Sequence, residues 1–96
     1  ITIDGVLATT DINENFGTTI YPNPSTGNFT VQFNPLAKQD ISIALIDIRG
    51  RLITTKHFSH QESFNRILNF SQASKGVYFI KITNGDYQIT EKIVIK

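Results

Sequence analysis

The sequence contains no cysteine, no tryptophan and no methionine among its 96 residues. Without cysteine the chain has no disulfide, no thiolate metal ligand and no cysteine nucleophile, so packing alone must hold its fold together. No stretch reaches the ~18 consecutive apolar residues that a membrane-spanning helix requires. A chain of this length accommodates one small domain, which excludes a multi-domain enzyme.

Charge is scarce and unevenly distributed. The formal net charge is +1, with nine basic and eight acidic residues. Three acidic residues precede Lys38, the first basic one, so the part from Ile20 onward has nine basic against five acidic residues, a charge of +4. The basic residues form no cluster that would follow a phosphate backbone. The composition therefore indicates no nucleic-acid partner.

The first 19 residues differ from the rest of the chain in their pattern of polar and apolar residues. The chain starts at Ile1 rather than Met and has no signal-peptide pattern, from which we expect a fragment or a processed product. Residues 1–7 look like the end of a strand and are interpreted as the remnant of a preceding domain. Residues 8–19 are polar and follow neither the helical nor the strand period, which predicts a linker.

From Ile20 onward, short runs of β-branched and aromatic residues alternate with polar ones and are separated by Gly, Pro and Asn. In the run that ends at Ile48 the apolar phase changes after Leu45, which predicts a central strand that is either buried on both faces or bulged there. Arg66 in an apolar phase predicts a strand near a sheet edge. About seven short strands with regular turn signals predict an all-β, two-sheet antiparallel sandwich. Strands are expected at residues 28–33, 40–48, 51–58, 64–70, 76–83 and 87–95.

Turn residues predict the connections. Arg49-Gly50 suits a tight hairpin in which the glycine adopts a positive φ. Asn84-Gly85 between two β-rich runs predicts a second hairpin with a type I′ turn at these two residues. In the stretch from Tyr21 to Gly27, two prolines restrict φ and the glycine lets the chain turn, which predicts a rigid corner before the next strand.

The sequence offers no arrangement that indicates catalysis. The only histidines, His57 and His60, are three residues apart, and on an extended strand such residues point to opposite faces. They are expected to be solvated, with no metal site. No paired carboxylates and no serine with a histidine partner stand out. We therefore expect a protein that is not an enzyme, with no cofactor and no small-molecule substrate.

Four short motifs follow one another along the chain: Tyr21-Pro-Asn-Pro24 with Gly27 soon after, Asp47-Ile-Arg-Gly-Arg51, Lys75-Gly-Val-Tyr-Phe-Ile-Lys81, and Lys92-Ile-Val-Ile-Lys96. Together they resemble the C-terminal sorting domain of proteins exported by the type IX secretion system, the Por secretion system of Bacteroidetes, in its type A form. The resemblance covers residues 20–96 without a gap. The last motif ends where the chain ends, as it does in the family.

The resemblance implies an Ig-like antiparallel β-sandwich of about seven strands in residues 20–96, carried at the end of a larger secreted protein. Its function would be to direct an upstream cargo domain, attached in cis, from the periplasm through the outer-membrane translocon to the cell surface or the extracellular medium. The implied partners are an outer-membrane shuttle protein, the translocon and a sortase. The sortase would cut in the linker between Ala8 and Thr19, and Gly17 is one candidate position.

The resemblance also implies which residues the shuttle and translocon recognise, although each of these residues has an equally good folding role. The last strand is the leading contact, because an edge there would pair with a partner strand or present its lysines to an acidic groove. The candidate binding residues are Tyr21, Pro22, Asn23, Pro24, Gly27, Gly50, Arg51, Gly76, Val77, Tyr78, Lys92, Ile93, Val94, Ile95 and Lys96.

An alternative interpretation is a carbohydrate-binding or fibronectin-like adhesive sandwich. Sugar platforms present flat aromatic faces, whereas this chain has no tryptophan and its phenylalanines lie in core phases. Only Tyr21, Tyr78 and Tyr87 are candidates for such a platform.

Overall fold

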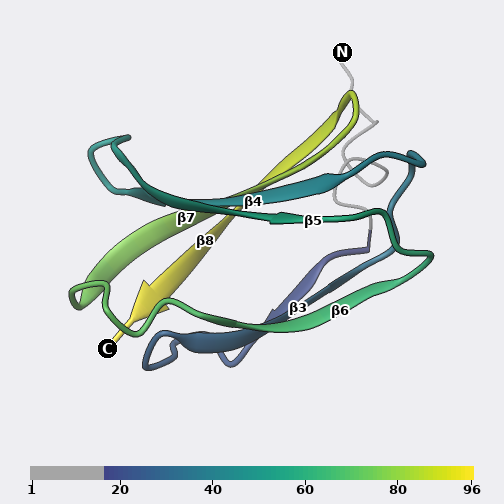
Figure 1. Cartoon of the computed structure of the whole chain (residues 1–96). Helices are drawn as coiled ribbons and strands as arrows, with labels where there is room; N and C mark the ends of the chain where they lie inside the picture. Colours follow the sequence, from purple (N-terminus) through teal and green to yellow (C-terminus); the bar gives the residue numbers. More distant parts are fainter. Residues whose placement is uncertain (1–16) are drawn as a thin grey trace, which may run out of the picture.

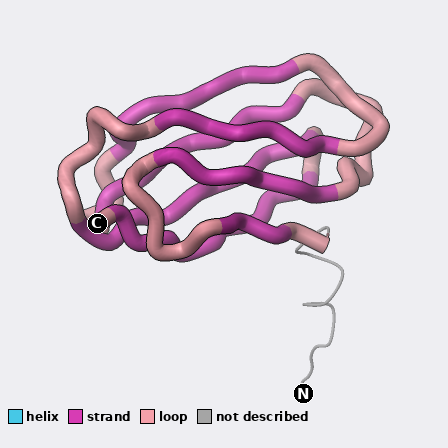
Figure 2. Tube along the Cα trace, turned by 90° about the horizontal axis from the view of Figure 1, so that it is seen from below, coloured by secondary structure: helices cyan, strands magenta, loops and turns pink. Residues whose placement is uncertain are grey.

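The computed structural model describes residues 17–96, and this part of the chain forms seven β-strands in two antiparallel sheets (Figures 1 and 2). The sheets lie face to face as two layers, which confirms the predicted all-β sandwich (Figure 1). No helix that could cross a membrane is found in residues 17–96. One sheet has the order β2 (Thr19–Tyr21), β3 (Asn28–Phe33), β6 (Phe64–Asn69), and the other β5 (Leu52–Phe58), β4 (Ile41–Asp47), β7 (Gly76–Asn84), β8 (Tyr87–Ile95).

The core lies between the two sheets and is built from alternate residues of each strand. In β3 the three apolar side chains of one phase are at most 3% exposed, as the period of two in the sequence requires. Phe33 stacks on Phe64 of the same sheet with ring centroids 4.8 Å apart, and Phe58 of the other sheet meets Phe64 edge-on at 5.1 Å. These rings join the two layers at one end of the sandwich.

Two sequence-based predictions about strand position are confirmed. Strand β4 lies between β5 and β7, and its register with β5 shifts between Leu45 and Ile46, so it is both central and bulged. Strand β6 is an edge strand of the smaller sheet, as predicted from Arg66. The guanidinium of Arg66 lies 5.7 Å from the ring centroid of Phe58, in a cation–π contact.

Strand β2 was not expected, and it begins inside the predicted linker. It pairs with β3 through Thr19↔Gln32 and Tyr21↔Thr30. Three residues are too few to show a period of two, so only the pairing reveals this strand. The predicted strand end in residues 1–7 and the linker residues 8–16 lie outside the described residues.

The β7–β8 hairpin exists as predicted, but its turn is shifted by one residue. Asn84 pairs with Tyr87, so the turn residues are Gly85, at φ 63°, and Asp86. Asn84 is instead the last residue of β7 and is fully buried. Its Oδ1 accepts a hydrogen bond from the Ala37 N–H (2.7 Å), and its Nδ2 donates to the carbonyls of Ala37 (3.2 Å) and Gln39 (3.1 Å). One buried side chain thus anchors the connection between β3 and β4.

Replacing Asn84 by alanine should lower the free energy of unfolding by about 2 to 3 kcal/mol, because it leaves three main-chain groups of the β3–β4 connection without their partner. Urea titration monitored by tyrosine fluorescence measures this. Asn34→Ala, which changes an exposed asparagine, is the matched control and should stay within about 0.5 kcal/mol of the parent. Equal urea midpoints for the Asn84→Ala variant and the parent would contradict the anchoring role.

Candidate recognition site at the C-terminal strand

Residues 22–27, here called the proline loop, are hydrogen-bonded to the end of β8. The peptide bonds Tyr21-Pro22 and Asn23-Pro24 are both cis. The Asn23 side chain donates to the Lys92 carbonyl (3.1 Å) and accepts from the Val94 N–H (3.0 Å). The Ser25 N–H donates to the Val94 carbonyl (3.0 Å), and the Lys96 N–H donates to the Ser25 carbonyl (2.8 Å). Four hydrogen bonds therefore attach this loop to the last five residues.

The proline loop covers part of a sheet edge. Strand β8 is an edge strand, and the N–H and carbonyl of Val94 that face away from β7 are taken by Asn23 and Ser25. Along an antiparallel strand, the N–H and carbonyl groups of every second residue point toward the neighbouring strand and those of the others point away from it. The next residues of β8 whose main-chain groups point away from β7 are therefore Thr90 and Gln88. Partner-strand addition was one of two predicted modes of contact for the last strand. At Val94 and Lys96 the main-chain groups it would need are already bonded.

Gly27 meets a steric requirement of the fold. Its φ is 107°, and an added Cβ would lie 2.6 Å from the Ser71 Cα. The Phe70 N–H donates to the Gly27 carbonyl at 2.7 Å, which holds the two segments in close approach. A residue with a side chain would separate them, so the glycine of the first motif has a sufficient folding role.

The β4–β5 hairpin is organised by Asp47. Its Oδ1 accepts from the N–H groups of Arg49 and Arg51, both at 2.9 Å, and its Oδ2 accepts from the Arg51 Nε at 3.0 Å. These bonds, chiefly that from the Arg51 N–H, lower the pKa of Asp47 below its ordinary value. The Gly50 N–H donates to the Asp47 carbonyl, and Gly50 adopts φ 87°, as predicted for this turn. Arg51 thus supports the turn, while its side chain stays 71% exposed.

The structure divides the predicted binding residues into buried and accessible ones. Ile93 and Ile95 are core residues, and Tyr78 is 7% exposed with its hydroxyl donating to the Ser74 carbonyl at 2.6 Å. Val77 and Val94 are half-buried on the outer face of the larger sheet, and Gly76 begins β7. Exposed positions are Tyr21, Pro22, Asn23, Pro24, Gly50, Arg51, Lys92 and Lys96. Of the two cleavage candidates, Gly17 is exposed in a turn before β2, and Ala8 lies outside the described residues.

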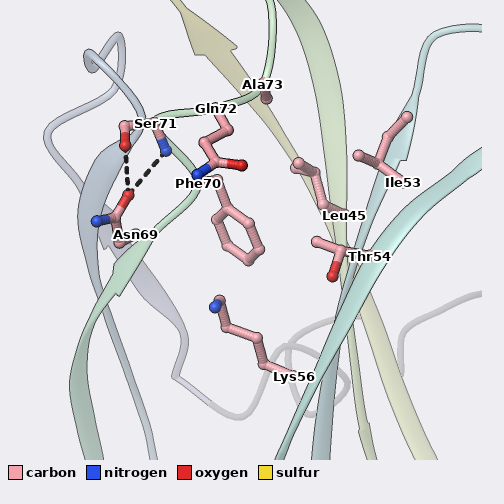
Figure 3. A pocket seen from close by; sticks show the side chains of 9 residues that line it. All are labelled: Leu45, Ile53, Thr54, Lys56, Asn69, Phe70, Ser71, Gln72 and Ala73. Atoms are coloured by element: carbon pink, nitrogen blue, oxygen red, sulfur yellow. Dashed lines mark hydrogen bonds between the residues drawn. The ribbon is translucent and has the colours of Figure 1, made fainter.

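A groove that the sequence did not predict opens between β5 and the β6–β7 connection, with a volume of about 580 Å³ (Figure 3). The Lys56 ammonium lies 5.2 Å from the centroid of the Phe70 ring, and Asn69 Oδ1 accepts from the Ser71 N–H (2.8 Å) and hydroxyl (2.6 Å). None of the predicted binding residues lines it. The one feature of the sequence that points to this groove is Lys56, which lies two residues from Phe58 and therefore on the same face of β5.

Neither a metal centre nor a sugar platform is assembled in residues 17–96. No group of three or more potential metal-ligating side chains is found in this range. Tyr21 lies in the smaller sheet beside the proline loop, whereas Tyr87 begins β8 at the opposite end of the larger sheet. With Tyr78 buried, the three tyrosines do not form a common surface.

Comparison with protein families decides the identity of this sandwich. The model of the secretion system C-terminal sorting domain matches residues 19–96, which is the whole sandwich including β2. The chain belongs to this family. It is a sorting domain of type IX secretion, which marks proteins for export to the cell surface or the extracellular medium, and the family is not an enzyme family. A search of curated proteins found no match to the chain.

Replacing Asn23 by alanine should loosen the end of β8, because two of its four hydrogen bonds to the proline loop are lost. We expect a loss of about 1 kcal/mol in the free energy of unfolding. In this variant, amide hydrogen exchange at Val94 and Lys96 should be faster than in the parent, while exchange of core amides should stay the same. Asn23→Asp keeps the acceptor for the Val94 N–H and should protect that amide better than alanine does. Unchanged exchange at both amides in Asn23→Ala would refute the attachment.

Lowering the pH should remove the contribution that the Asp47 carboxylate makes to the stability of the fold. Because the folded-state pKa is lowered, this carboxylate stabilises the fold above the ordinary aspartate pKa of about 3.9, and the contribution is lost as the pH falls through the folded-state pKa. Asp47→Asn should therefore be less stable than the parent at pH 7, and the difference should shrink toward zero below pH ~4. Thermal unfolding across this range measures it. A difference independent of pH would contradict the ionic role.

Proposed function

We propose that the folded sandwich of residues 20–96 is itself the export signal, recognised by an outer-membrane shuttle protein and the translocon. The observation that carries the proposal is the family match over the whole sandwich rather than over a short peptide. Machinery that exports many unrelated cargos requires a surface that does not depend on the cargo attached upstream. A small sandwich with hydrogen-bonded corners supplies such a surface.

The terminal lysines are the main accessible feature of the last motif. Lys92 and Lys96 are exposed, while Ile93 and Ile95 between them are buried. The main chain of this segment is bonded to β7 on one side and to the proline loop on the other. The two ammonium groups therefore start from a fixed main chain, which reduces the entropy lost when an acidic partner binds them.

A sortase removes the domain, in this proposal, by cutting within residues 8–19. A protease needs accessible main chain outside regular strands. Gly17 is exposed and lies two residues before the start of β2, so a cut on its N-terminal side would leave every strand of the sandwich intact. The cargo domain upstream would then be freed from its signal.

The proposal is tested by fusing the full chain to an exportable reporter in a bacterium that has type IX secretion. The reporter should appear outside the cell, and Lys92→Ala combined with Lys96→Ala should block its export without changing the melting temperature by more than a few degrees. Lys38→Ala combined with Arg66→Ala removes the same charge away from the terminus and from the outer face of the larger sheet, and serves as the matched control.

Retention of the parent fusion in the periplasm, with the domain folded, would overturn the sorting role in this chain. Normal export of the Lys92/Lys96 variant would leave the sorting role in place and remove the two lysines from the recognition site.

A further inference from the structure

The outer face of the larger sheet changes character along its length. At the end near the β7–β8 turn, neighbouring strands place polar side chains side by side. Ser42 pairs with His57 on one side and Thr83 on the other, and Thr83 pairs with Gln88. This is the polar, solvent-facing surface that an antiparallel sheet normally has on the side away from the core.

At the other end, the same face is apolar. Ile46 pairs with Leu52 and with Phe79, so three large side chains cross three strands in one row. In the next row Val77 pairs with Val94. These five residues are here called the outer apolar patch. Ile46, Phe79, Val77 and Val94 alternate with the buried residues of their strands and are half-buried, and Leu52, which joins the row through its pairing with Ile46, is 59% exposed. The patch extends across four strands, about 14 Å.

On the outer face of the smaller sheet, the described residues place two large exposed side chains, Tyr21 and Ile67, and Thr30 of β3 separates them. Ile67 of β6 is 77% exposed, but its partner in β3 is Thr30 and its neighbours in β6 on that face are Asn65 and Asn69. Separated exposed apolar side chains are ordinary on a protein surface, whereas a contiguous group of five indicates an interaction site.

Five basic residues lie at the same end of the sheet as the outer apolar patch. Lys92 lies beside Phe79 in the same row, and the β4–β5 turn, the residue before β7 and the chain terminus add Arg49, Arg51, Lys75 and Lys96. Among the residues that the structure describes, Asp47 at this end is already bonded to Arg51, and Glu91, which precedes Lys92 in β8, has the phase of the core residues Ile93 and Ile95 rather than that of the patch. Asp40 and Asp86 lie at the opposite end of the sheet. The same end of the sheet therefore combines apolar side chains with an excess of basic ones.

We propose that the outer apolar patch is the docking surface for one protein of the export machinery, whose matching surface is an apolar depression rimmed by carboxylates. The inference rests on the proposed function and adds three residues that are not among the predicted binding residues: Ile46, Leu52 and Phe79. Contact through the face of the sheet also fits the covered edge, because Val94 has its main-chain groups bonded but its side chain on the outer face. Apolar burial supplies affinity, and the basic rim supplies orientation.

The test compares the double variant Leu52→Thr, Phe79→Thr with Ile67→Thr in the full-chain reporter fusion. Threonine keeps the strand preference, and the control makes the same kind of change on the other sheet. The patch variant should lower the exported fraction about tenfold and leave its folded reporter in the periplasm, while Ile67→Thr is exported like the parent. Should the double variant melt below the growth temperature, Leu52→Lys, at an exposed position, replaces it.

The basic rim has its own pair of variants. Arg49→Glu at the patch should reduce export, whereas Lys38→Glu, the same charge reversal at the far end of the sandwich, should not. Equal export of these two variants would overturn the carboxylate-rimmed partner.

Two results would overturn docking at the patch while the sorting role stands: export of the patch variant at the parent level, or a parent domain that sedimentation shows to be a dimer and that the patch substitutions convert to a monomer. In the second case a further copy of this chain would be the occupant. Failure of the parent fusion to leave the cell would instead overturn the proposed function itself, so the two failures are distinguishable.

Discussion

The attachment of the proline loop to the last five residues is the interaction on which the rest of this molecule depends. The loop connects two strands of the smaller sheet, whereas the terminal segment is the edge of the larger one, so their hydrogen bonds join the two layers at one end. Without them β8 would be held in the sheet by β7 alone. Ile93 and Ile95, in the attached segment, are each 2% exposed and belong to the core.

Folding and recognition share the same short segment because a β-strand has two faces. Along the terminal motif, isoleucines turned to the core alternate with Lys92, Val94 and Lys96 turned to solvent. The buried residues hold the strand in place, and the accessible ones present charge and apolar surface in a fixed spacing. This arrangement suits a protein that a partner recognises through the shape and charge of its surface.

The motifs that mark the family have different physical reasons. Gly27 is required by a close approach to Ser71, and Gly50 by the conformation of a turn that Asp47 organises. Neither of these glycines offers a side chain to a partner. The surface features that remain at this end are the basic side chains and the outer apolar patch, because the β4–β5 hairpin, the start of β7 and the chain terminus all lie at the same end of the sandwich (Figure 1).

The sequence by itself determined the strand class, the central and bulged character of β4, the edge position of β6 and the family, because a period of two, phase changes and ordered motifs are local patterns. Tertiary structure alone decided that Asn84 is a buried anchor rather than a turn residue, that three residues form β2, and that Asn23 bonds to Lys92, 69 residues away. These features depend on pairing between segments far apart in the chain. A local pattern of side chains cannot specify which main-chain groups meet across such distances, because that is set by the register and packing of both sheets together.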